Sequence, residues 1–318
     1  MRFPFALPAL LLGFFAPSAL AQEPPEVPSW KWTEDQWRGA VERVRAGKSL
    51  QPREWPGGAR VAVALSFDFD NETPSLRDNQ TSPSLMSNGQ YGARAGLPRV
   101  LSLLDAYDVP ASFFIPAVSA LLYPEEVKRI VAAGHEIGVH GWIHERNSGL
   151  EKRDEKGLLE RAIETLTKLT GKKPSGIRTP SWDYSPHTLE ILEELGLFYD
   201  SSLMADDSPY ELVASGRPTG IVELPVEWIL DDAPYFNMSR FGNLRPHTTP
   251  DEVYTIWRAE FDRAYEEGGL FLLTNHPHII GHRSRIAMLE RLLQHIRRHP
   301  GVWFATHEQV ARYVKDGG

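Results

Sequence analysis

The sequence predicts an α/β fold, a (β/α) barrel of seven or eight parallel strands. From Arg60 onward, short strand-like runs alternate with longer helical stretches, and strands separated by helices pair in parallel through crossovers. Four helical stretches end at a glycine that suits a left-handed helix end: Gly134, Gly171, Gly196 and Gly268. This many units favours an irregular closed barrel. An open doubly wound sheet is the alternative, but no G-x-G-x-x-G motif follows the first strand.

The expected elements follow one another through a single domain, residues 59–318. Strands are expected at 61–67, 111–115, 136–140, 175–179, 198–201, 221–228, 270–274 and 302–305. Helices are expected at 97–107, 124–133, 155–170, 186–195, 251–267, 285–299 and 308–314. The long connection at 71–96 has no strand of its own, and so long a connection inside a compact domain is often functional, for example as a lid.

Before this domain, residues 22–58 are rich in proline and tryptophan and show no strand pattern, so we expect an arm packed on the barrel. A helix is expected from Thr33 to Arg45, because Thr33 can cap it and Glu34 and Asp35 suit its first turn. The tryptophans of this arm either pack it onto the barrel or form a surface for stacking carbohydrate: Trp30, Trp32, Trp37 and Trp55.

Residues 1–21 predict an export signal. Arg2 provides the charged start, an apolar stretch follows from Phe3 to Phe15, and Ala19-Leu20-Ala21 is a small-x-small cleavage site. An uncleaved membrane anchor is the alternative, but the apolar stretch is short and interrupted by prolines. We therefore expect a secreted or periplasmic protein with no stable membrane insertion after cleavage.

Composition excludes several classes of function. The 318 residues carry a formal net charge of −8 and no run of lysines or arginines, so nucleic acid and acidic membrane surfaces are poor partners. There is no cysteine, which excludes disulfides, thiolate metal ligands and a cysteine nucleophile. Any metal ion must be held by histidine, aspartate or glutamate.

Polar residues gather where the predicted strands end. In a parallel barrel, chemistry collects at the carboxyl ends of the strands, and five strand ends carry such residues here. They are Asp68 and Asp70, His140 and His144, Arg178, Asp200, and His276 and His278. Although these side chains are far apart in sequence, we expect them to converge on one rim of the barrel.

The aspartate pair and the first histidine pair indicate a metal site. The strand period of two points Asp68 and Asp70 to the same side, where they repel each other unless a cation or a shared proton intervenes; a solvated Asx turn is the alternative. A spacing of four puts His140 and His144 on one helical face, which suits metal ligation, although a surface pair can have the same spacing. One aspartate and two histidines form a three-ligand set that leaves a position for water.

The remaining residues then suit a hydrolytic reaction. The second aspartate is free to act as a base, because a nearby carboxylate can complete the deprotonation of metal-bound water. His276 could protonate a leaving nitrogen, and Asp200 or another carboxylate could orient a histidine. Arg178 could pair with the catalytic aspartate and hold it ionised; a purely structural ion pair is the alternative.

Five stretches together resemble the ordered motifs of a known family. These stretches are SFDFD, HEIGVHGWIHER, RTPSWDYS, YDSS and LLTNHPH. In this order they resemble the polysaccharide deacetylase family, over roughly residues 55–315. The resemblance implies a distorted (β/α) barrel and a divalent metal ion, zinc or a similar one.

The resemblance also implies a role for each matching position. Asp70, His140 and His144 match the metal ligands, and Asp68 matches the catalytic base. The supporting and acid residues are Arg178 beside the base, His276 as general acid, and Asp200 as the carboxylate that tunes the catalytic histidine. The backbone near Ser181 and Trp182 is expected to supply an oxyanion N–H.

The spacing Asp-Phe-Asp departs from the adjacent aspartates that are commonest in the family. It is similar to the branch that holds allantoinase-like proteins, cyclic-imide hydrolases and some peptidoglycan deacetylases, as are Tyr91-Gly92-Ala93-Arg94 and the stretch 276–281. The expected reaction is hydrolysis of a non-peptide carbon–nitrogen bond, with N-deacetylation of an acetylated amino sugar in a glycan as the first hypothesis. Hydrolysis of a cyclic imide, ureide or other small amide is the alternative. A glycan-binding module with a decayed site is a third hypothesis, which the retained site residues disfavour.

Overall fold

The computed structural model describes residues 27–237 and 248–317, so the predicted signal at 1–21 lies outside the described residues. The chain divides after Ala40 into a small N-terminal unit and a large unit. The small unit contains η1 (Ser29–Lys31) and almost all of α1 (Glu34–Val41). Within it, the Trp37 side chain donates a hydrogen bond to the Ser29 carbonyl at 3.3 Å.

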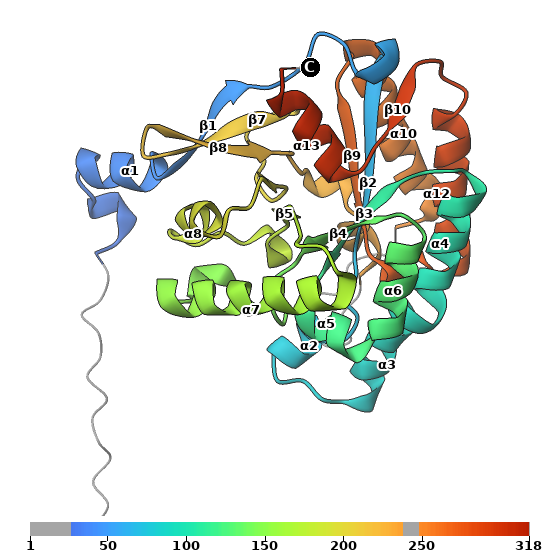
Figure 1. Ribbon diagram of the computed structural model, residues 1–318, viewed down its shortest axis with the longest axis horizontal. Helices are drawn as coiled ribbons and strands as arrows, with labels where there is room; N and C mark the ends of the chain where they lie inside the picture. Colours follow the sequence, from blue (N-terminus) through green and yellow to red (C-terminus); the bar gives the residue numbers. More distant parts are fainter. Residues whose placement is uncertain (1–26, 238–247, 318) are drawn as a thin grey trace, which may run out of the picture. The chain divides into compact units, whose positions relative to one another are not determined.

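All the strands of the described residues lie in the large unit, in one curled sheet (Figure 1). They are β1 Val44–Ser49, β2 Val61–Asp68, β3 Ala111–Ile115, β4 Glu136–Val139, β5 Gly176–Ile177, β6 Tyr199–Asp200, β7 Tyr210–Ala214, β8 Arg217–Glu223, β9 Leu270–Asn275 and β10 Val302–Phe304. The order across the sheet is β1-β7-β8-β6-β5-β4-β3-β2, with β9 and β10 both paired to β2. All eight predicted strands are therefore present, although β5 and β6 are shorter than predicted.

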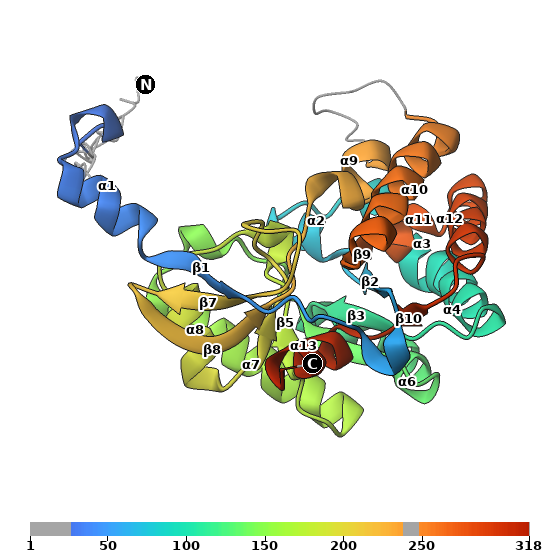
Figure 2. The same cartoon turned by 90° about the horizontal axis from the view of Figure 1, so that it is seen from above.

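Helices connect these strands and pack around the sheet. They are α2 Thr73–Arg77, α3 Pro83–Tyr91, the π-helical turn η3 Gly92–Gly96, α4 Leu97–Ala106, α5 Ala117–Leu122, α6 Pro124–Ala132, α7 Lys152–Thr170, α8 Thr188–Leu195, α9 Ala233–Phe236, α10 Pro250–Glu267, α11 Pro277–Ile280, α12 Arg283–Ile296 and α13 His307–Lys315. Short 3-10 turns are η2 Pro56–Gly58, η4 Asn147–Gly149, η5 Pro180–Trp182 and η6 Trp228–Leu230. Figure 2 shows α4, α10 and α12 outside β2, β9 and β10. No helix of the described residues is long and apolar enough to cross a membrane.

The predicted strands pair in parallel, which confirms the (β/α) arrangement. Within the described residues, however, β8 and β9 do not form a ladder, and only the bridge from Asp231 to Thr274 lies there. The sheet is therefore a curled half-barrel rather than a fully closed one. The residues that follow β8 form η6 and α9, and this irregular connection lies in the sequence between β8 and β9 in place of a further strand.

Two antiparallel strands correct the expectation of a purely parallel sheet. β7 forms a hairpin with β8, because Ser215 and Gly216 both adopt positive φ, 47° and 81°, as a type I′ turn requires. β1 then pairs antiparallel with β7. Residues 22–58 were expected to contain no strand, so β1 is a second correction. The large unit begins at Val41, whereas the sequence placed the domain boundary at residue 59.

Buried apolar side chains hold the strands in register beneath the rim. The rings of Phe67 on β2 and Phe113 on β3 stack at 5.2 Å, and both are fully buried. Trp55 packs on Trp303 and Tyr313 at 5.9 and 6.1 Å, as expected for a tryptophan that anchors the segment before β2. Of the other arm tryptophans, Trp30 and Trp37 are exposed.

Candidate active site

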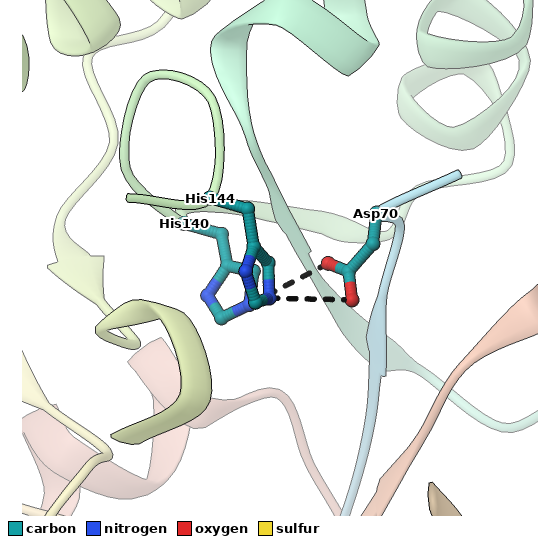
Figure 3. Close-up of side chains that lie close together, drawn as sticks. All are labelled: Asp70, His140 and His144. Atoms are coloured by element: carbon teal, nitrogen blue, oxygen red, sulfur yellow. Dashed lines mark ion pairs between the residues drawn. The ribbon is translucent and has the colours of Figure 1, made fainter. Parts of the chain in front are cut away.

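Asp70, His140 and His144 converge as the sequence predicted (Figure 3). Asp70 follows β2 and His140 follows β4. The Nε2 atoms of His140 and His144 lie 3.5 Å from Oδ1 and Oδ2 of Asp70 respectively, and all three side chains are buried. Among the described residues, the Oδ1 atom of Asp70 has no hydrogen-bond partner, and a buried carboxylate oxygen without a partner is costly. Two nitrogens and one carboxylate fit a divalent ion such as zinc.

A tight turn brings the two histidines together, not the helical face that their spacing predicted. Gly141 and His144 adopt positive φ, 72° and 62°, and a non-glycine residue in this region costs about 1–2 kcal/mol. The Glu145 carboxylate offsets this cost by accepting hydrogen bonds from the backbone N–H groups of Trp142 and Ile143 at 2.9 and 2.8 Å. The ligand geometry is therefore built into the backbone.

The hydrogen bond of the His140 ring suits ligation through Nε2, whereas the guanidinium of Arg77, which can only donate, leaves the proton of neutral His144 on Nε2 in the arrangement seen here. His140 Nδ1 lies 2.7 Å from the Arg178 carbonyl, which can only accept, so the proton is on Nδ1 and Nε2 is free to bind a metal. Arg77 on α2 reaches Nδ1 and the carbonyl of His144 at 3.1 and 3.3 Å. Burial, with the charges of His140 and Arg77, holds the pKa of His144 well below its usual value, so His144 is neutral, as a ligand must be.

Asp68 and Arg178 form the predicted buried ion pair. Arg178 Nη1 donates to Asp68 Oδ1 at 2.9 Å and to Ser66 Oγ at 2.7 Å. Its Nε and Nη2 donate to Ser201 O and Oγ at 3.1 and 3.0 Å. Burial opposes ionisation of Asp68, but Arg178 and the neighbouring histidines outweigh it and lower the pKa of this carboxyl. Asp68 is therefore ionised and able to accept a proton.

His276 faces the two aspartates from β9's side of the rim. Its Nε2 lies 3.6 Å from Asp70 Oδ2 and 3.9 Å from Asp68 Oδ2. Its Nδ1 lies 2.7 Å from Asp232 Oδ1, and its backbone N–H donates to Asp232 Oδ2 at 3.0 Å. Burial works against protonation, but Asp232 and Asp231 outweigh it and hold the pKa of His276 well above its usual value. The ring is poised to donate a proton.

The carboxylate that hydrogen-bonds His276 is Asp232, so the expectation for Asp200 is corrected. Asp200 instead accepts hydrogen bonds from the Ser201 N–H at 2.9 Å and the Ser202 hydroxyl at 2.6 Å. Ser201 in turn accepts a hydrogen bond from Arg178. Asp200 therefore positions the residues that hold the base Asp68, not the acid His276. Asp232 was missed because it lies in the irregular connection after β8, with no strand before it. The adjacent acidic residues Asp231-Asp232 were the available signal.

The other residues that the sequence suggested, Trp182 and His278, make no direct contribution to the cluster in this structure. The Trp182 N–H donates to the Thr179 carbonyl at 2.9 Å, so in this conformation it is not available to an oxyanion. The Trp182 ring packs on Trp228 at 4.1 Å between centroids. His278 is half-buried, with its ring centroid 5.6 Å from that of His276, and desolvation lowers its pKa to about 3.

The segment 71–96, suggested as a lid, is folded as α2, α3 and η3 and packs on α11. A Cβ added at Gly96 would lie 2.0 Å from the Pro277 carbonyl oxygen, so this close approach requires glycine. The tight packing makes the segment part of the wall beside the site, and its α2 supplies Arg77.

Comparisons with known proteins show which family the chain resembles. A family model for polysaccharide deacetylase matches residues 78–199. The chain is 32% identical over 282 residues to a peptidoglycan deacetylase from Helicobacter pylori, with 79% of this chain and 95% of that protein covered. A solved structure described as a candidate polysaccharide deacetylase from Mycobacterium smegmatis is 37% identical, covers 86% of this chain and 96% of that one, and has a TM-score of 0.78. A PuuE allantoinase is 27% identical, with 84% and 93% covered and a TM-score of 0.72. The chain belongs to the polysaccharide deacetylase family, whose members are metal-dependent hydrolases.

Proposed function

We propose that this protein removes acetyl groups from N-acetylated amino sugars of a cell-wall glycan, peptidoglycan in the first place. The observation that carries the proposal is the arrangement of Asp68–Arg178 and His276–Asp232 on the same three-ligand cluster. Amide hydrolysis needs a base for water and an acid for the leaving nitrogen, and this site offers one of each.

Asp70, His140 and His144 would hold the divalent ion, which we expect to be zinc because the donors are two imidazoles and a carboxylate. When bound, such an ion polarises a carbonyl and lowers the pKa of water. Asp68, kept ionised by Arg178, accepts the proton of the attacking water. His276, held by Asp232, delivers a proton to the amine as it leaves. Arg178 makes no proton transfer itself.

An exposed aromatic surface favours a glycan over a small amide. Trp228 is 46% exposed and lies four residues before Asp232, so its Cα is within about 14 Å of the general acid's partner. Its ring rests on Trp182, and the backbone beside it is anchored by hydrogen bonds from Trp257 and Tyr235 to the Ile229 carbonyl at 2.8 and 3.0 Å. A fixed, exposed indole offers a face on which a neighbouring sugar ring can stack.

Hydrolysis of a cyclic imide or ureide is the second candidate. The Asp-x-Asp spacing and the similarity to PuuE allantoinase favour it. Export outside the cytoplasm, proposed from residues 1–21, favours the glycan, because cell-wall polymers lie there.

Purified protein loaded with zinc should be assayed against peptidoglycan fragments, chitooligosaccharides, allantoin and cyclic imides. Release of acetate from the glycans, abolished by a chelator and restored by zinc, is the expected result. Hydrolysis of allantoin or imides without acetate release from any glycan would transfer the proposal to the small-amide function.

A further inference from the structure

Helices α10 and α12 carry a second group of metal-ligating side chains, outside the site described above. Asp262 lies on α10, His295 on the last turn of α12, and His299 just beyond it. One donor atom from each lies within 4.8 Å of the others. His295 Nε2 is 2.5 Å and His299 Nε2 is 4.0 Å from Oδ1 of Asp262.

His299 already has the hydrogen bonding of a ligand. Its Nδ1 lies 3.1 Å from the His295 carbonyl oxygen, and a carbonyl can only accept, so the Nδ1 proton is donated there. Its Nε2 faces the Asp262 carboxylate at 4.0 Å and is the ring nitrogen that remains to bind a metal. Ligating histidines almost always donate the other ring N–H to a carboxylate or a backbone carbonyl in this way.

Aromatic rings hold both imidazoles in place. The buried Phe261 meets the rings of His295 and His299 edge-on, with centroids 5.8 and 5.1 Å apart. Tyr265 packs on His299 at 4.8 Å. The side chains of His295 and His299 are only 18% and 26% exposed, so their orientation costs little additional entropy when an ion binds.

An ion pair between His295 and Asp262 explains only part of this arrangement. It accounts for the 2.5 Å contact but not for the position of His299 Nε2, which lies 4.0 Å from the same oxygen. Tetrahedral ligands at about 2.0–2.1 Å from zinc are about 3.3 Å apart, and the observed 2.5 and 4.0 Å lie on either side of that value. A small rotation of the Asp262 side chain would equalise them. The competing cation is Arg258, whose Nε is 4.0 Å from the other oxygen of Asp262.

We propose that Asp262, His295 and His299 bind a second divalent transition-metal ion of the zinc class, which clamps α12 to α10. Both helices contact each other, and α10 also packs on β9, the strand that leads to His276. The ion would have a structural role, since its ligands come from α10 and from the end of α12 rather than from the strand ends that carry the active site.

The test is the zinc stoichiometry of metal-stripped protein by titration with zinc alone. We expect two tightly bound ions in the wild-type protein, one in His299→Ala, one in His140→Ala, and none in the double variant. Asp262→Asn should also bind one, and His187→Ala, which changes a histidine outside both groups, should bind two. His299→Ala is the decisive variant because it leaves the His295–Asp262 ion pair intact; circular dichroism confirms that each variant is folded.

A thermal measurement separates this site from the proposed active site. In the His140→Ala background, zinc at a hundredfold excess over its dissociation constant should raise Tm by roughly 4–8 °C, and adding His299→Ala should abolish that rise. A single ion in the wild-type protein, a second ion that binds only at millimolar zinc, or two ions retained by His299→Ala would overturn the inference. Failure of the proposed active-site ligand set would instead appear as an unchanged stoichiometry in His140→Ala, and failure of the proposed function as the absence of acetate release from glycans by the zinc-loaded wild-type protein.

Discussion

Asp68→Asn should abolish turnover while leaving the metal bound, whereas Asp70→Asn should weaken metal binding as well. The two side chains look interchangeable in sequence but have different neighbours. Asp68 is paired with Arg178 at 2.9 Å, while Asp70 lies 3.5 Å from both ligand histidines. An amide cannot accept the proton of the attacking water, so the loss of the base should reduce turnover by about 10²–10⁴.

The stability cost of Asp68→Asn can be estimated from the contacts of Arg178. Removing one partner of a buried ion pair costs about 3–5 kcal/mol when the remaining charge is left uncompensated. Arg178 retains three hydroxyl or carbonyl acceptors, from Ser66 and Ser201, and the amide of asparagine keeps an oxygen in reach. We therefore expect a cost near the lower end of that range, about 3 kcal/mol, which leaves a folded protein in which turnover is measurable.

The assay is zinc content by mass spectrometry together with acetate release from the same preparation. Because Asp68 and Arg178 act as a unit, Asp68→Asn combined with Arg178→Met should be little slower than Asp68→Asn alone. Loss of zinc in Asp68→Asn with retention in Asp70→Asn would show that the two roles are reversed. Full activity in both variants would refute the mechanism.

Three further predictions follow from the site and the fold. Asp232→Asn should reduce kcat by about 10–100-fold, in line with loss of a charge-assisted hydrogen bond of about 1.5–3 kcal/mol, without changing zinc content; an effect of Asp200→Asn equal to it would contradict the assignment of Asp232. Trp228→Ala should raise KM for a chitooligosaccharide about fivefold, because roughly 1 kcal/mol of ring contact is lost. Trp228→Phe should keep KM close to the wild-type value. Identical KM values in all three proteins would refute the proposed stacking surface. Burial opposes ionisation of the Glu308 carboxyl, yet Lys172 and Arg312 lower its pKa to about 2. The stabilising contribution of the Glu308 carboxylate is present above its unfolded pKa and is lost as pH falls from about 4.5 through 2. Urea unfolding of the wild-type protein should therefore show a loss of roughly 1–3 kcal/mol of unfolding free energy over this range. The Glu308→Gln variant, already destabilised at neutral pH, should not show this loss.

The residues on regular strands could be predicted from the sequence. Asp68, His140, Arg178 and His276 each follow or end a parallel strand, and the topology alone brings such positions to one rim. Their convergence needed only the alternation of strands and helices, together with the period of two that pairs Asp68 with Asp70.

Features set by irregular backbone could not be predicted in the same way. The turn at His140–His144 depends on positive φ at His144, which Glu145 stabilises through two N–H groups. Asp232 lies between η6 and α9, where no periodic pattern indicates a position. The hairpin of β7 with β8 depends on its two-residue turn. In each case a local hydrogen bond or turn conformation decides the geometry, and neither hydrophobic periodicity nor motif order reports it.

The charge balance of the buried site gives an independent argument for a bound cation. Two buried cations, Arg178 and protonated His276, face a larger number of buried carboxylates: Asp68, Asp70, Asp231 and Asp232. With all four carboxylates ionised, these groups alone would leave an excess of two negative charges, four minus two. Burial, with the charge of Asp232, raises the pKa of Asp231 to about 7, and burial also raises the pKa of Asp70. Desolvation has this effect first, and a neighbouring negative charge adds to it. A cation beside Asp70 would relieve this repulsion, so the electrostatics of the site and its donor atoms favour the same kind of ligand.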